Sequence, residues 1–135
     1  IFFFHKYTII YLRNYIIMRS LNPPKIIDEK LYQLLREERP KDFNQLKASG
    51  VTCDMSFCDF RSLDLRGIDA SGLDWTGAYF RGADLRGLDL RFTKMEGASI
   101  CNAKISGVYF PKELDPMEIW LSLEQGTRMR YSSND

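Results

Sequence analysis

Apolar side chains recur at every fifth position between residues 53 and 110. Each five-residue unit has an apolar residue at its centre and a small or apolar residue two positions earlier. Seven of the eleven units between residues 57 and 107 also carry Gly two positions after the centre. The central positions are Met55, Phe60, Leu65, Ala70, Trp75, Phe80, Leu85, Leu90, Met95, Ile100, Ile105 and Phe110.

A period of five fits neither an α-helix nor a flat strand. Five residues rotate the helix face by about 140°, and an odd spacing sends alternate strand residues to opposite faces. The apolar side chains stay together only if the chain bends once in every unit. Gly suits such a bend because it tolerates positive φ. The pattern therefore predicts a chain that winds around an apolar core, with backbone pairing between successive circuits.

Units such as LDLRG at residues 63–67 and ADLRG at residues 83–87 resemble the pentapeptide-repeat family. The tandem repetition makes this resemblance specific. It implies a mainly β fold, a right-handed quadrilateral β-helix with four units per coil, so that the twelve units would form three coils. The chain looks like a short bacterial member with helical caps. Some residues depart from the small polar residue that the family prefers, namely Tyr79, Lys94, Lys104 and Tyr109.

Three coils would expose their core at both ends, so caps are needed. Residues 26–39 predict an amphipathic helix that ends at Pro40, and Lys41–Ala48 predicts a second helix. We expect this hairpin to cover Met55 and Phe60.

A third helix should start at residues 115–118, which read DPME. Asp115 can cap it, Pro116 suits the first position, and Glu118 completes a capping-box pattern. We expect this helix to end at Gly126 and to cover Phe110, with the basic, aromatic tail packed along the coil or free to bind a partner.

The expected organisation is an N-terminal helical cap at 18–50, the β-helix at 51–111, and a capping helix with its tail at 112–135. Residues 1–17 differ in composition from the rest, and we interpret them as a non-native or untranslated upstream segment that precedes a true start at Met18. The alternative is an interfacial membrane anchor. Four polar residues, His5, Lys6, Arg13 and Asn14, interrupt any transmembrane span.

Little in the chain suggests catalysis, a cofactor or a metal. The single His lies in the doubtful first segment, which argues against His-dependent chemistry. Cys53 and Cys58 occupy inward positions, and Cys101 lacks a nearby base that would make it a nucleophile. An odd number of Cys without a secretion signal favours a reducing, cytoplasmic compartment.

Stacking superposes residues 20 positions apart, for example Asp64 with Asp84 and Arg66 with Arg86. Paired carboxylates can serve glycoside hydrolysis, but these would point outward from a convex wall and would lack a cleft. The Arg columns allow two interpretations, namely neutralisation of the Asp columns or a docking face for an acidic partner. The candidate partner-binding residues are Arg61, Arg66, Arg81, Arg86, Arg91, Arg128 and Arg130.

These observations favour a non-enzymatic protein–protein interaction or scaffold module whose partner is unknown. The alternative implied by the resemblance is a DNA mimic that modulates a topoisomerase such as gyrase, a role associated with long acidic dimeric rods. The formal net charge of +1 argues against this mimicry and against direct nucleic-acid binding. We expect no membrane association unless residues 1–17 are genuine.

Overall fold

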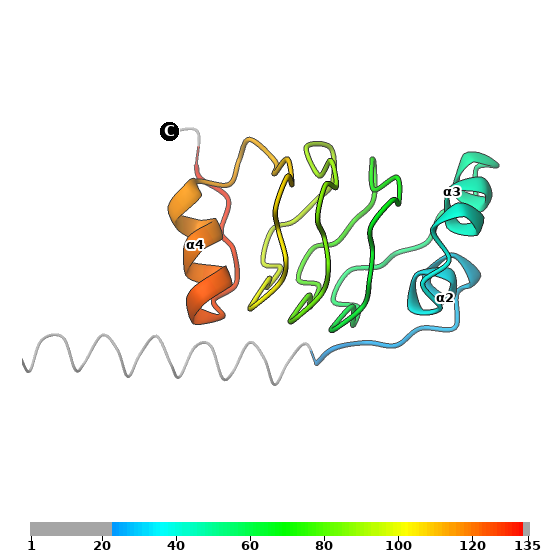
Figure 1. The fold of residues 1–135 in the computed structure, drawn as a ribbon, viewed down its shortest axis with the longest axis horizontal. Helices are drawn as coiled ribbons and strands as arrows, with labels where there is room; N and C mark the ends of the chain where they lie inside the picture. The colour runs from blue at the N-terminus through cyan, green and yellow to red at the C-terminus, as the bar shows by residue number, and fades with distance from the viewer. Residues whose placement is uncertain (1–22, 134–135) are drawn as a thin grey trace, which may run out of the picture.

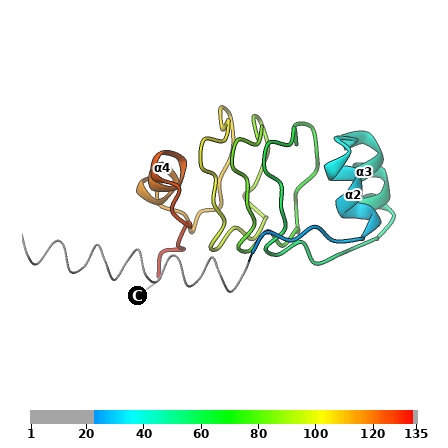
Figure 2. The same ribbon diagram turned by 90° about the horizontal axis from the view of Figure 1, so that it is seen from below.

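The computed structural model describes residues 23–133. Between a helical hairpin at one end and a single helix at the other, the chain winds in successive loops that lie side by side (Figure 1). The perpendicular view in Figure 2 shows the same order. The helices in this part of the chain are α2 (Lys30–Arg36), α3 (Pro40–Ala48) and α4 (Pro116–Gln125). The interpretation of residues 1–17 and of Met18 falls outside the described residues.

The predicted fold class is wrong, because residues 23–133 contain no β-strand and so no β-helix of three coils. Backbone pairing consists of isolated parallel bridges between residues 20 positions apart, such as Asp64 with Asp84 and Asp84 with Lys104. The physical reason lies in the short unit. Most units spend two of their five residues in a turn and have a single bridging residue, which is too few for the run of consecutive pairs that makes a strand.

We call residues 53–72, 73–92 and 93–112 the first, second and third layers, and together they form the repeat stack. The N–H groups of one layer donate to carbonyls of the next, as in Leu85 N–H to Lys104 O at 2.9 Å. The apolar centres of the units point inward as predicted. Ten of the twelve, from Met55 to Ile100, are at most 2% exposed, whereas Ile105 and Phe110 are half-buried.

Aromatic rings fill the middle of the stack. The rings of Phe60 and Phe80, one layer apart, lie parallel with centroids 5.0 Å apart. Trp75 packs against both rings, and Tyr32 of α2 meets Phe60 edge-on at 5.4 Å. These contacts join the helical hairpin to the first two layers in one apolar core.

Gly77 shows why the turns favour glycine. Its φ is +65°, and a Cβ at this position would overlap the ring of Phe57 in the layer below. Within the repeat stack, three turns without Gly nevertheless adopt positive φ, at Phe57, Ser62 and Asn102. This conformation has a steric cost for an L-residue, so these three turns are strained relative to the Gly turns.

The N-terminal cap has the predicted two helices but different boundaries. Helix α2 begins at Lys30 rather than near residue 26, and Pro40 is the first residue of α3 rather than only the end of the preceding helix. Tyr32 donates its hydroxyl to Asp59 O at 2.6 Å. Asn44 bonds Gly67 O at 3.0 Å and accepts from Asp69 N–H at 2.7 Å. The hairpin covers Met55 and Phe60 as expected.

The C-terminal cap differs from its prediction in the way that helix α4 begins. Asp115 makes no capping hydrogen bond through its side chain, and Glu118 binds Arg130 instead, so the predicted capping box does not form. Helix α4 ends, as predicted, at Gly126 with φ +74°. Ser122 Oγ accepts from Ile100 N–H at 3.0 Å, which places the helix over Ile100.

The tail after α4 lies along the third layer. Met129 donates its N–H to Ala98 O at 2.9 Å, and its carbonyl accepts from Gly97 N–H at 2.7 Å. Tyr131 accepts from Met95 N–H through its hydroxyl at 2.7 Å. The tail therefore packs along the stack, which is the first of its two expected arrangements.

Candidate interaction surface

An Asp and an Arg two residues apart form the same ion pair four times along the stack. In each pair the Asp Oδ1 accepts from the backbone N–H and the Nε of the Arg, while Oδ2 accepts from Nη2 at 2.7–2.9 Å. The pairs are Asp59–Arg61, Asp64–Arg66, Asp84–Arg86 and Asp89–Arg91. The Arg side chains remain 42–55% exposed, so the stack presents four oriented guanidinium groups to solvent.

The Asp residue initiates the pairing because its carboxylate caps the turn that follows it. Where the residue two positions later is Ser or Thr, the same backbone bond forms, as in Ser56 N–H to Asp54 and Thr76 N–H to Asp74. Side chains of Asp often bond the backbone two residues on in this way. The Arg then adds its two side-chain donors to a carboxylate that is already oriented.

The ion pairs hold the carboxylates in the charged form. Hydrogen bonds from the Arg86 side chain lower the pKa of Asp84 to about 2, and those from Arg91 do the same for Asp89. The pKa of Arg66 is raised, first by its hydrogen bonds to Asp64 and then by the charges of both Asp64 and Asp84. The predicted acid and base columns therefore meet as ion pairs within each unit.

The remaining three candidate Arg residues differ in their surroundings. Arg81 is exposed and has no ion-pair partner within residues 23–133. Arg128 donates to Gly97 O at 3.0 Å and lies over the ring of Tyr79, 4.8 Å from its centroid, with a further bond to the Tyr79 hydroxyl. Arg130 binds Glu118 at 2.8 Å. Sequence reasoning gave no sign of the Arg128 contacts, because they depend on how the tail folds back.

An exposed aromatic pair flanks one of the ion pairs. Phe92 is 72% and Tyr109 62% exposed, and the Arg91 guanidinium carbon lies 5.9 Å and 5.1 Å from the two ring centroids. Cation–π contacts of this kind contribute about 0.5–1 kcal/mol at exposed sites. Because large apolar side chains are costly to expose, this patch adds to the surface available for a partner.

The described residues offer no assembled catalytic or metal site. Cys101 is half-buried beside Gly126, and Cys53 and Cys58 are also free thiols. Burial raises the pKa of Cys58 to about 11, which keeps this thiol protonated and unreactive. No group of three or more potential metal ligands occurs within residues 23–133, and none of the helices there is long and apolar enough to cross a membrane.

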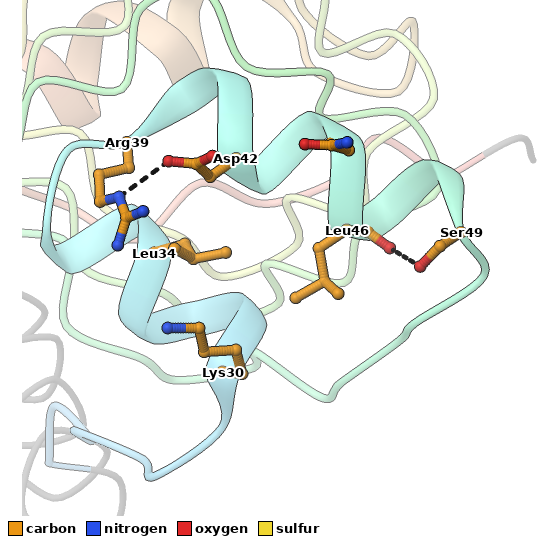
Figure 3. A pocket seen from close by; sticks show the side chains of 7 residues that line it. Lys30, Leu34, Arg39, Asp42, Leu46 and Ser49 are labelled. Atoms are coloured by element: carbon orange, nitrogen blue, oxygen red, sulfur yellow. Dashed lines mark hydrogen bonds and ion pairs between the residues drawn. The ribbon is translucent and has the colours of Figure 1, made fainter.

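A shallow groove runs between α2 and α3 (Figure 3). Leu34 and Leu46 form part of its floor, and Arg39 Nε binds Asp42 at 2.8 Å along its rim. Ser49 donates its hydroxyl to Leu46 O at 2.6 Å. The groove is open to solvent, and Arg39 and Asp42 are already paired with each other. Lys30 is the one charged lining residue without an ion pair within the described residues, so the groove lacks the several convergent polar groups of a small-molecule site.

Comparison with protein families gives a match to pentapeptide repeats, in eight copies, at residues 53–86 and 64–100. Proteins with these repeats are generally non-enzymatic and are typical interaction modules. No curated protein and no solved structure matches the chain.

Proposed function

We propose that this chain, whose residues 53–100 match pentapeptide repeats, is a non-enzymatic protein–protein interaction module. The paired Arg side chains of the repeat stack would dock an acidic surface of a protein partner. The observation that carries the proposal is the repeated Asp–Arg pair. In the Asp84–Arg86 pair, the guanidinium donates through Nε and Nη2, which leaves about three of its five N–H donors for another carboxylate.

The pairing prepares each Arg for binding. A free Arg side chain loses rotamer entropy when it binds, at a cost of about 0.5–1.5 kcal/mol. In this stack the turn-capping Asp already holds the Arg in one conformation, so part of this cost is met on folding. Arg is also enriched among the residues that dominate binding energy at protein interfaces. Oriented, half-exposed Arg side chains therefore support docking better than mobile Lys side chains would.

The same pairs weaken the alternative function, mimicry of DNA toward a topoisomerase. A DNA mimic needs a continuous negative surface, whereas the second layer carries three Asp and three Arg residues. Two of those Asp residues, Asp84 and Asp89, are neutralised by their own Arg. No observation in the described part of the chain favours this alternative.

Affinity capture with variants in which basic residues are changed to Gln tests the proposal. In the test variant Arg61, Arg66 and Arg86, each paired with its own Asp, are changed to Gln, which removes three positive charges from the stack. The control variant changes Lys30, Arg39 and Lys41 to Gln, an equal loss of charge on the exposed N-terminal cap. We expect the wild type and the control to enrich the same partner from a native lysate, and the test variant to lose it. Equal enrichment by the test variant would refute docking through the Arg side chains.

We also infer that the protein works in a reducing compartment such as the cytoplasm. The support is chemical, since Cys53, Cys58 and Cys101 are all free thiols. Alkylation of the protein in intact cells, before lysis, should label Cys101 fully. A disulfide through Cys101 in the isolated native protein would contradict this inference.

A further inference from the structure

The C-terminal cap covers only half of the third layer. Met95 and Ile100, which lie beneath the tail and α4, are fully buried. Ile105 and Phe110 occupy the same position in the next two units, yet both are half-buried, and Ser106 and Gly107 between them are exposed. Within residues 23–133, the second half of the third layer therefore has no cap.

Unpaired backbone groups mark this uncovered part. In the second layer the N–H groups of Leu85 and Gly87 donate to carbonyls of the third layer at 2.9 Å, and Ala83 O accepts from Lys104 N–H at 2.9 Å. The equivalent groups one layer further on are Ile105 N–H, Gly107 N–H and Ala103 O. None of the three has a backbone partner within residues 23–133. We call residues 103–107 the open edge.

Elsewhere the chain covers such edges with its own extended segments. On the first layer, Lys25 donates its N–H to Phe57 O at 2.9 Å and accepts from Asp59 N–H at 2.8 Å. On the third layer, Met129 bonds the backbone of Gly97 and Ala98. Both cases show that one extended residue can satisfy an edge of this stack, so the open edge has the form of a site for a further extended segment.

The charge around the open edge selects its occupant. The outward position of each unit is Asp four times in the first layer and three times in the second, but never in the third, where Lys104 follows Asp64 and Asp84 in the same column. Arg66 reaches Asp84 in the layer above it, at 3.3 Å. In the layer above Arg86, the residue that corresponds to Asp84 is Lys104, so Arg86 has no carboxylate there. Lys104 is exposed and forms no ion pair within the described residues.

We propose that the open edge binds an extended acidic segment of the partner protein, which adds to the stack as Asp84 and Leu85 add to the layer below them. This inference rests on the proposed function. The backbone N–H of the acidic residue donates to Ala103 O, and the carbonyls of the segment accept from Ile105 and Gly107. The carboxylate lies over Lys104, and the next, apolar side chain covers Ile105.

Two other occupants fit the charge less well. A second copy of the chain, paired edge to edge, would bring its own Lys104 to this Lys104, and like charges that face each other across paired strands are destabilising. Residues 1–22 of the same chain contain Lys6, Arg13 and Arg19 but no Asp or Glu. Neither supplies the carboxylate that the open edge lacks.

Peptide binding to the full chain tests the proposal. The probe is a labelled peptide, SGADLEGS, whose central residues ADLEG follow the unit ADLRG at 83–87. One control peptide, SGAKLKGS, reverses the charge, and a second carries an N-methyl group on its Asp so that it cannot donate to Ala103 O. We expect fluorescence polarisation to show binding of the probe at least about tenfold tighter than either control peptide, a difference of about 1.4 kcal/mol.

Variants and amide exchange locate the binding. Lys104→Glu should weaken probe binding about tenfold and favour the lysine peptide, whereas Lys41→Glu, on the exposed surface of α3, should change neither. The Ile105 and Gly107 amides should exchange quickly in the free protein and slowly with the probe bound. Probe binding that ignores Lys104→Glu, or that leaves these two amides unprotected, would overturn the proposal.

Two other outcomes would show that something other than an acidic partner segment occupies the open edge. Slow exchange of Ile105 and Gly107 in the dilute free protein would show that residues 1–22 already cover the edge, and protection that grows with protein concentration would show a second copy. Either result overturns the acidic-segment proposal. If the probe fails but the Arg-to-Gln variant still loses its captured partner, only this inference fails and the interaction module stands.

Discussion

Arg66 Nε lies 3.3 Å from Asp84 Oδ2 in the layer above, while Arg66 Nη2 binds Asp64 in its own unit at 2.8 Å. This contact joins two layers through side chains, in addition to the backbone bond from Leu65 N–H to Asp84 O. Asp84 also accepts three bonds from Arg86 and is only 8% exposed. Asp84 is therefore contacted both by Arg86 in its own unit and by Arg66 in the layer below.

Replacement of Asp84 by Asn should destabilise the protein more than replacement of an exposed Asp. The Asn amide turns a donor toward two guanidinium groups, and the loss of charged hydrogen bonds costs about 1.5–3 kcal/mol. Asp69→Asn is the control, because the Asp69 side chain is 58% exposed and its pair with Lys47 is worth about 0–1 kcal/mol. Urea unfolding of both variants measures the difference. Equal costs would show that the Asp84 contacts add no stability.

Stability should fall as the medium becomes acidic. Hydrogen bonds from Arg lower the pKa values of Asp84 and Asp89 to about 2 in the folded protein, whereas an unfolded Asp titrates near 3.9. A lowered pKa contributes stability above the unfolded value, and this contribution is lost as the pH falls from about 4 to about 2. Melting temperatures measured across this range should decrease, and the decrease should be smaller in Asp84→Asn. A flat profile in the wild type would contradict the ion-pair geometry.

The period of five predicted the inward residues well because burial depends on the number of residues between bends, which the sequence displays. It also predicted columns of Asp and Arg on the outer wall, and the ion pairs agree with the first interpretation of these columns, mutual neutralisation. It did not predict the absence of strands. The number of residues that a unit can use for backbone pairing depends on how many residues its turn takes up, and here most units pair through only one residue.

The caps were harder to predict than the stack. Sequence reasoning found the three helices but not the contacts by which Glu38, Asn44 and Ser122 satisfy the ends of the stack. Such polar contacts join segments more than 20 residues apart, and no local pattern encodes them. For the same reason the partial cover of the third layer, on which the open edge depends, is visible only in the folded molecule.

Ser122→Ala should reveal the importance of the C-terminal cap. Ser122 is fully buried, and its hydroxyl oxygen is the acceptor for Ile100 N–H. Its removal leaves that N–H buried without a partner, at a cost of about 1–3 kcal/mol. Ser132→Ala, at an exposed tail position, should cost much less. Chemical unfolding and amide exchange at Ile100 provide the measurements, and an unchanged exchange rate in Ser122→Ala would contradict the bond.

Two turn substitutions separate strain from crowding. Ser62 has φ +63° without being Gly, so Ser62→Gly should stabilise the protein by up to about 1 kcal/mol, because Gly adopts this conformation without the steric cost. Gly77→Ala should destabilise it by about 1–3 kcal/mol, since its Cβ meets the Phe57 ring in addition to the positive φ.

Gly72→Ala is the matched control for Gly77→Ala, because its φ is also positive, +75°, but no atom lies within 4 Å of its Cβ. Both Ala variants carry the strain of positive φ, so the difference between their unfolding free energies isolates the overlap with Phe57. We expect Gly77→Ala to be the less stable of the two in urea unfolding. If the two variants unfold at the same urea concentration, the Phe57 ring moves aside at no cost, and the close packing between the first and second layers at this corner is not a source of stability.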